Sequence, residues 1–170
     1  TVTADAGQSK AYGAVDPTFT YTVAPALIGT DAFTGALSRA AGESIGSYAI
    51  TQGTLSAGSN YTITFVAADF GITTKPITVT ATAGQIKVYG TANPVYAYTF
   101  APALEGSDAF TGALSRAAGE NVGSYAITQG TLTAGSNYTI TFVAADFGIT
   151  GKPITVTADA GQSKVYGAVD

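Results

Sequence analysis

The side chains that could do acid–base chemistry or hold a metal ion in this sequence are eleven carboxylates, because histidine and cysteine are absent. Without those two residue types the chain has no thiol nucleophile, no histidine-dependent catalytic triad and no structural zinc site. Most of the carboxylates stand beside glycine or proline, where aspartate commonly bonds its own backbone in a turn. They are Asp5, Asp16, Asp31, Glu43, Asp69, Glu105, Asp108, Glu120, Asp146, Asp159 and Asp170. We therefore predict no catalytic, cofactor-binding or metal-ligating residues, and no enzyme activity.

Calcium binding is the metal chemistry that carboxylates alone could support. The calcium loop of EF-hand type follows the pattern Asp-x-Asp-x-Asp-Gly, which does not occur here. We expect the chain to fold without a metal ion, so that a chelator leaves its melting temperature unchanged.

An amide cross-link between side chains is another chemistry open to this composition. It requires a buried lysine, an asparagine or aspartate, and a neighbouring carboxyl group. The candidates are Lys10, Asn60 and Glu43, and then Lys87, Asn137 and Glu120 later in the chain. Nothing in their spacing brings these residues together, and we expect the two lysines to lie at the surface of an edge strand.

The ten tyrosines could instead stack on sugar rings. Most of them lie on the apolar face of an alternating segment, which is typical of core packing. Tyr12, Tyr89 and Tyr166 each precede a glycine, and we expect these three to be partly exposed. Carbohydrate binding stays open as an alternative function.

The overall composition limits the class of protein and the class of partner. Hydrophobic residues make up 46% and charged residues 11% of the chain, which is too apolar for a disordered segment. No apolar run approaches the roughly 18 residues of a membrane span. The net charge of −4 is unlike the basic surface of a nucleic-acid-binding protein. We expect no membrane and no nucleic-acid partner, and we place any secretion signal upstream of Thr1.

A tandem repeat organises the chain. Shifting the sequence by 77 residues gives 61 identities in 77 positions, and a second shift aligns residues 155–170 with residues 1–16 with one difference. A unit of this length is typical of a small domain that folds alone. We predict two repeats and the first strand of a third, at residues 1–75, 76–152 and 153–170.

Each repeat alternates large apolar residues with small or polar ones, the period of a half-buried β-strand. Such segments are residues 18–23, Tyr48 with Ile50, residues 61–66 and residues 77–81. Residues 36–41 have helical propensity, but six residues make a marginal helix, and we interpret them as the end of a strand from Phe33. Glycine-rich turns separate the segments, so we predict an all-β fold.

The alternation also predicts which side chains are buried. They are Phe19, Tyr21, Val23, Leu37, Tyr48, Ile50, Tyr61, Ile63 and Phe65, with their counterparts 77 residues later. Ile28 and Glu105 occupy the same repeat position, and this exchange is tolerable only where the side chain reaches water. We expect both of these side chains to reach solvent.

The joins between repeats contain Lys75-Pro76 and Lys152-Pro153. Proline holds its predecessor in an extended conformation, so one repeat runs into the next without a linker and a rod of domains is expected. Residues 155–170 have no complete domain to enter. We expect them to continue as an extended strand beyond the second repeat, ordered by a neighbouring chain or a longer filament.

Three motifs of the repeat carry a family resemblance. Between Ile77 and Pro153 they read Gly-Gln-x-Lys-Val-Tyr-Gly, then Asp-Ala-Phe-Thr-Gly-Ala-Leu-Ser-Arg, then Asn-Tyr-Thr-Ile-Thr-Phe. This pattern resembles the MBG, or mostly β-grasp, repeat. The resemblance implies a β-grasp-like domain whose first and last strands run parallel, so that its two ends lie at opposite poles.

Repeats of this kind occur in large bacterial surface and secreted adhesins, including two-partner-secreted adhesins similar to filamentous haemagglutinin and adhesins that cross-link the biofilm matrix. The resemblance therefore implies a secreted or cell-surface protein that acts as a stalk, a spacer or part of a matrix fibre. It supplies no catalytic residues. The expected partners are neighbouring repeats, with polysaccharide or other copies in a fibre. The alternative is a module that binds exopolysaccharide or associates with itself.

Overall fold

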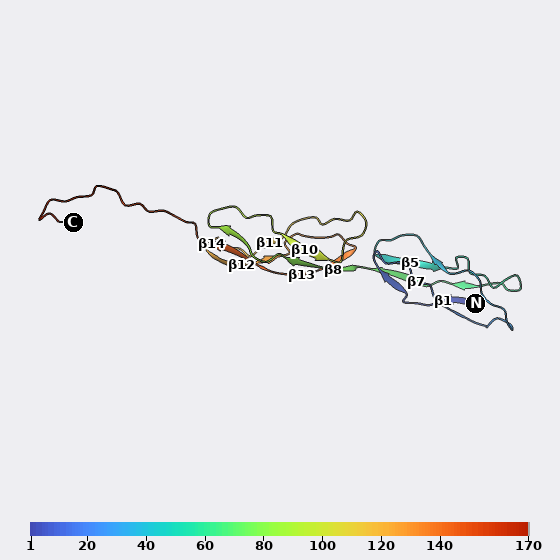
Figure 1. Cartoon of the computed structure of the whole chain (residues 1–170). Coiled ribbons are helices and arrows are strands. Elements are labelled where there is room, and N and C mark those ends of the chain that lie inside the picture. Colours follow the sequence, from blue (N-terminus) through green and yellow to red (C-terminus); the bar gives the residue numbers. More distant parts are fainter. Residues whose placement is uncertain (170) are drawn as a thin grey trace.

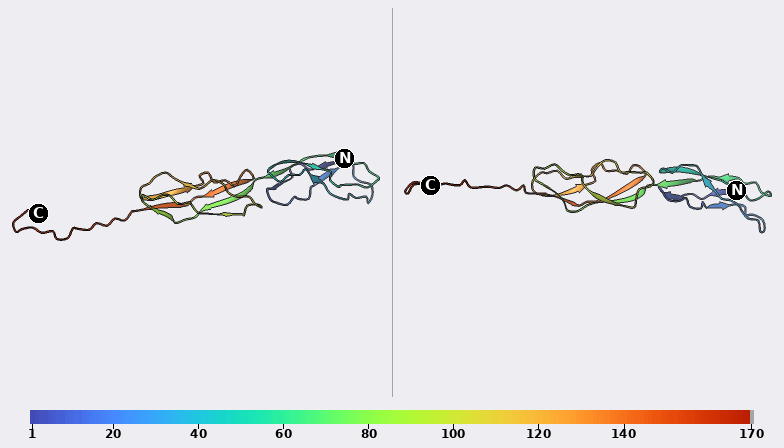
Figure 2. Two further views of the ribbon diagram at one scale, coloured as in Figure 1. Left: turned by 90° about the horizontal axis from the view of Figure 1, so that it is seen from above. Right: turned by 45° about the horizontal axis from the view of Figure 1, so that its top comes forward.

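A computed structural model describes residues 1–169, and these residues form strands, turns and loops without a helix. None of the described residues is therefore part of a helix that could cross a membrane. Two β-domains follow each other end to end, and an extended segment leaves the far end of the second (Figure 1). The other two views show the same linear order (Figure 2). The all-β prediction and the tandem arrangement are confirmed.

The first repeat consists of a three-stranded and a four-stranded sheet, in the orders β3-β1-β6 and β2-β7-β5-β4. Its strands are β1 (Val2–Ala4), β2 (Ser9–Ala11), β3 (Tyr21–Val23), β4 (Ser38–Arg39), β5 (Gly46–Thr51), β6 (Phe65–Val66) and β7 (Asp69–Thr73). β1 pairs antiparallel with β3 and parallel with β6, and β7 pairs parallel with β2 and antiparallel with β5.

The second repeat has the same topology, in the orders β10-β8-β13 and β11-β12-β14-β9. Its strands are β8 (Lys75–Ala81), β9 (Gln85–Val88), β10 (Tyr98–Ala101), β11 (Ser115–Arg116), β12 (Gly123–Thr128), β13 (Tyr138–Val143) and β14 (Asp146–Thr150). Only Thr74 separates β7 of the first repeat from β8 of the second. In the second repeat β8 pairs parallel with β13 and β14 pairs parallel with β9. The chain enters this repeat at one pole and leaves at the other (Figure 1).

The core of each repeat lies between its two sheets. In the first repeat Ile50, Phe70, Ile72 and Val2 are almost fully buried, and the counterparts in the second repeat are buried in the same way. Phe70 and Ile72 alternate with exposed or half-buried residues along β7, so one face of this central strand points inward. Phe70 and Ile72 were not among the side chains that the sequence predicted to be buried.

The burial prediction is confirmed in part. Leu37 and Ile50 are buried, whereas the other seven positions in the first repeat are half-buried. Phe100 contradicts the prediction, because its side chain is 43% exposed. Its ring packs edge-on against Phe110 at 4.9 Å between centroids, at the rim of the sheet and outside the core. Alternation predicts which side chains of a strand point inward. It does not predict whether an inward side chain lies at the centre or at the rim of the sheet.

Several predicted strands are shorter than expected. The segment 61–66 forms a six-residue strand only in the second repeat, where β13 pairs with β8 from Lys75 onward. In the first repeat β6 holds two residues, which pair with Val2 and Thr3 of β1. Residues 36–41 form no helix, and β4 covers Ser38–Arg39. Gly35 precedes it with a φ of 73°, which ends the extended run from Phe33.

Residues 151–169 are exposed and contain no strand. Within this segment the Ala168 amide donates a hydrogen bond to the Val165 carbonyl at 3.0 Å. Val156 and Tyr166 are 88% and 104% exposed. The predicted position beyond the second repeat is confirmed for residues 153–169, but the predicted strand is not found, because these residues pair with no strand of the described chain. Asp170 lies outside the described residues. That a neighbouring chain or filament orders this segment stays a prediction.

Candidate functional site

A buried lysine stands at the centre of the polar residues of the first repeat. Lys10 lies on β2, the edge strand of the four-stranded sheet, and its side chain is 5% exposed. Its ammonium nitrogen is 2.7 Å from Asp16 Oδ1 and 2.6 Å from Glu43 Oε2. The edge strand was predicted correctly, but the prediction of a surface lysine is wrong. The loop after β2 supplies Asp16 and the loop between β4 and β5 supplies Glu43, and both carboxylates contact the ammonium group.

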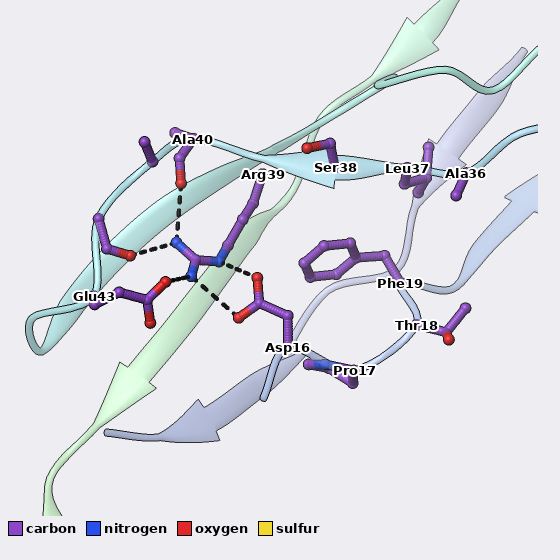
Figure 3. Close-up of a pocket in the computed structure, with 12 residues that line it drawn as sticks. Asp16, Pro17, Thr18, Phe19, Ala36, Leu37, Ser38, Arg39, Ala40 and Glu43 are labelled. Carbon is purple, nitrogen blue, oxygen red and sulfur yellow. Dashed lines mark hydrogen bonds and ion pairs between the residues drawn. The ribbon is translucent and has the colours of Figure 1, made fainter. Parts of the chain in front are cut away.

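A buried arginine closes the group. Arg39 donates from Nε to Asp16 Oδ2 at 2.7 Å and from Nη2 to Glu43 Oε1 at 2.5 Å (Figure 3). Its Nη1 donates to the backbone oxygens of Ala40 and Gly42. The guanidinium also lies 5.5 Å from the centroid of the Phe70 ring, against the core. Lys10, Asp16, Arg39 and Glu43 form the first ion cluster, with two positive and two negative groups.

The first ion cluster holds its members in their charged forms. The hydrogen bond from Arg39 is the largest influence on Asp16 and lowers the pKa of that carboxyl. The hydrogen bond from Lys10, followed by that from Arg39, lowers the pKa of Glu43. Burial opposes the charge of Lys10, but its bonds to both carboxylates outweigh burial and raise its pKa. At neutral pH this cluster therefore offers neither a free base nor an uncharged amine.

The structure gathers the residue types of an amide cross-link, although not the trio that the sequence suggested. Asp16 stands beside Lys10, whereas Asn60 is exposed in a turn. Amide formation requires the uncharged amine to attack the carbonyl carbon of a protonated carboxyl, with loss of water. Arg39 opposes this by stabilising both carboxylates as anions. We assign the group as a structural ion cluster on this ground.

The second repeat has a counterpart with one carboxylate fewer. Lys87 Nζ lies 2.5 Å from Glu120 Oε2, and Arg116 pairs with the same carboxylate. Asn93 replaces Asp16 and accepts from Arg116 Nε and Nη2 at 3.3 and 3.2 Å. Lys87, Asn93, Arg116 and Glu120 form the second ion cluster. It buries two cations against a single anion.

An open groove lies over each ion cluster. In the first repeat it has a volume of about 530 Å³ and is lined by residues 16–19 and 36–43, as Figure 3 shows. The groove of the second repeat, over Asn93, Tyr96 and residues 114–120, has about 310 Å³. The charged groups beneath each groove bond to each other, so they provide cohesion and no arrangement for acid–base catalysis. Among residues 1–169 no group of three or more acidic residues could hold a metal ion.

The contact between the repeats is the second polar site. Tyr12 donates from its hydroxyl to Asp108 Oδ2 at 2.9 Å, and Tyr138 donates to the same oxygen at 2.6 Å. The two tyrosine rings meet edge-on at 5.4 Å between centroids. The amide of Ile45 donates to Asn137 Oδ1 at 3.2 Å. Tyr12 packs against the cores of both repeats.

The three tyrosines that precede a glycine differ in exposure, because only Tyr12 lies at the contact between the repeats. Tyr89 and Tyr166 are 47% and 104% exposed, and Tyr12 is half-buried at the contact between repeats. The expectation for Ile28 and Glu105 is also confirmed: Ile28 is 78% exposed, and Glu105 is half-buried and pairs with Lys75. No charge is left without a partner at this repeat position.

The two arginines were missed by the sequence reasoning, although a signal was present. They are the only arginines of the chain, and Arg39 and Arg116 stand at the same position of each repeat with a glutamate four residues on. A long, costly charged residue that recurs once in every copy of a weakly charged repeat indicates a fixed partner. The sequence predicts Asp108 only as a turn residue, because its role at the contact between repeats has no local signal.

Comparison with known proteins identifies the repeat. The family model described as MBG domain (YGX type) matches residues 1–71 and again residues 77–148. Neither the curated proteins nor the solved structures give a significant match.

Proposed function

The chain belongs to the MBG domain family of the YGX type, and on that premise we propose that it is a spacer of an extracellular bacterial adhesin. It extends a binding region away from the cell or builds a matrix fibre. The observation that carries this proposal is the contact between the repeats, where one residue links two strands and Tyr12 belongs to both cores. A pair of domains joined in this way transmits force along its length.

The strand order supports the same role. A force that stretches the second repeat acts on the start of β8 and on the end of β14. β8 pairs parallel with β13 over six residues, and β14 pairs parallel with β9 over four. A force along the chain loads these ladders in shear, so that several hydrogen bonds must break together.

Composition supports an extracellular location. The chain has no cysteine and no methionine, the two residues most readily oxidised outside the cell. The secreted or cell-surface location, and the adhesin to which the repeats would belong, are part of the proposal.

Stretching single molecules of the chain tests the spacer role. We expect two unfolding events, each releasing about 250 Å, the extended length of roughly 75 residues at about 3.4 Å per residue, less the end-to-end length of the folded repeat. Each event should show a distinct force peak, because the parallel ladders break in shear. Extension without force peaks would contradict the proposal.

Binding of exopolysaccharide is the second candidate, and the open groove over the first ion cluster favours it. The half-buried Phe19 lines that groove beside polar groups, a combination that sugar-binding sites use. Passing the chain over immobilised exopolysaccharides tests this function. Retention with a sub-millimolar Kd, lost in Phe19→Ala but kept in the matched variant Tyr96→Ala, would establish a binding role for the first repeat.

A further inference from the structure

The contact between the repeats has two halves, which we call the C-terminal face and the N-terminal face. The C-terminal face belongs to the first repeat and the N-terminal face to the second. The C-terminal face consists of Tyr12, Gly13 and Ile45. The N-terminal face consists of Glu105, Asp108, Asn137 and Tyr138. Every residue of these two faces has a counterpart 77 residues away, so each repeat carries both faces.

The Tyr-Gly pair of the C-terminal face fits its partner closely. Tyr12 supplies a ring to both cores and a hydroxyl to Asp108. Gly13 has a φ of 78°, and a Cβ at this position would run into the side chain of Glu105. The positive φ therefore favours glycine at this position, and the absence of a Cβ leaves room for the Glu105 side chain.

The N-terminal face has the same internal hydrogen bonds whether or not another repeat covers it. In the first repeat the Tyr61 hydroxyl donates to Asp31 Oδ2 at 2.6 Å, and the Ile28 amide donates to Tyr61 at 2.9 Å. The second repeat has the same pair of bonds, from Tyr138 to Asp108 at 2.6 Å and from the Glu105 amide to Tyr138 at 2.8 Å. The acceptor carboxylate is thus held in place whether or not a tyrosine from another repeat reaches it.

The C-terminal face of the second repeat is uncovered. Tyr89 is 47% exposed and Val122, the counterpart of Ile45, is 62% exposed. Gly90 has a φ of 82°, and a Cβ there would meet no atom within 4 Å. The backbone thus keeps the conformation of Gly13 although nothing approaches it.

We propose that Tyr89, Gly90 and Val122 form a docking face for the N-terminal face of a further MBG repeat, with the Tyr89 hydroxyl donating to that repeat's aspartate. The Tyr-Gly pair is then the joint that fixes the angle between successive repeats. This inference rests on the proposed spacer function and names its partner: a repeat with aspartate and tyrosine at the positions of Asp31 and Tyr61. Continuity with the covered joint of the same chain supports that occupant over any other.

The test completes a third repeat. Because residues 155–170 repeat residues 1–16, adding a copy of residues 17–74 after Asp170 gives a full third domain with an N-terminal face. The chain has no cysteine, so introduced cysteines are the only sites for spin labels. One labelled chain carries Thr51→Cys and Thr128→Cys across the first joint. The other carries Thr128→Cys and the same change in the added copy of Thr51, across the second joint.

We expect a narrow distribution of label distances across both joints, with similar mean values. Tyr89→Ala should abolish the narrow peak across the second joint only, and Tyr12→Ala across the first only. Tyr89→Phe, which keeps the ring, should broaden the peak less than Tyr89→Ala. A broad distribution across the second joint of the parent chain, or no response to Tyr89→Ala, would overturn the proposal. The stretching experiment reads individual repeats, so a flexible joint between force-resistant repeats would refute this inference and leave the spacer function standing.

Discussion

The two ion clusters show how one substitution alters buried charge without altering the fold. The first cluster balances Lys10 and Arg39 with two carboxylates, and the second has Asn93 where Asp16 stands. Asn93 keeps the position and accepts from arginine, but at 3.2–3.3 Å where Asp16 accepts at 2.7 and 3.1 Å. The shape of the site is therefore set by the arginine fork, and the charge of its partner adjusts the stability.

The grooves above the clusters differ in one core aromatic residue. Phe19 packs edge-on against Phe70 at 5.2 Å, and Tyr96 packs against Phe147 at the same distance. The hydroxyl of Tyr96 is buried and has no hydrogen-bond partner. The second repeat thus carries both a charge imbalance and an unpaired polar atom that the first lacks.

The largest expected difference between the repeats comes from replacing the buried lysine. Lys10→Met leaves two carboxylates with one arginine, whereas Lys87→Met leaves one of each. We expect a loss of about 2 kcal/mol in the first repeat and less than about 1 kcal/mol in the second, because an uncompensated charge remains only in the first. Amide hydrogen exchange of β5 and β12 measures the two repeats separately. Equal losses of stability in the two repeats would show that the exchange of Asp16 for Asn93 does not determine the cost of removing the lysine.

The aromatic pair gives opposite effects in the two repeats. Tyr96→Phe removes the unpaired hydroxyl and should stabilise the second repeat by about 1 kcal/mol. Phe19→Tyr places a hydroxyl in the equivalent core position and should destabilise the first by a similar amount. Denaturant unfolding monitored by exchange in each repeat measures both changes. Stabilisation by Phe19→Tyr would reveal an acceptor that the structure does not contain.

Acid sharpens the comparison of Asp16 with Asn93. The pKa of Asp16 is lowered by Arg39, so its contribution is present above the pKa of the unfolded chain and is lost as pH falls through the folded value. Asp16→Asn should therefore flatten the fall of the first repeat's stability below about pH 4, and Asn93→Asp should steepen that of the second. Thermal unfolding between neutral pH and acid, read in each repeat, checks the change in slope. An unchanged slope in Asp16→Asn would mean that Asp16 titrates normally.

The last prediction is that neither repeat contains a covalent amide bond between side chains. Because the lysine and arginine of each cluster together hold its carboxylates as anions, neither lysine should form an amide. The intact mass should equal that of the sequence. A deficit of one water would locate a bond between Lys10 and a carboxyl group, and a deficit of one ammonia a bond between Lys87 and Asn93.

The sequence by itself determined the repeat, the all-β fold and the inward face of several strands, because these depend on local alternation and on self-similarity. Residues 18–23 and 77–81 show their inward faces in the pattern of their own side chains. The sequence also located the uncovered tyrosines, since a tyrosine before a glycine turn ends a strand at the domain edge.

Only the tertiary structure decided which polar groups meet. Lys10 and Glu43 are 33 residues apart, and Tyr12 and Asp108 are 96 apart and belong to different repeats. Such pairs depend on where the loops lie in the folded domain and on the angle between domains, neither of which leaves a period in the sequence. A lysine on an edge strand is therefore predicted at the surface, although here Lys10 is buried and pairs with Asp16 and Glu43.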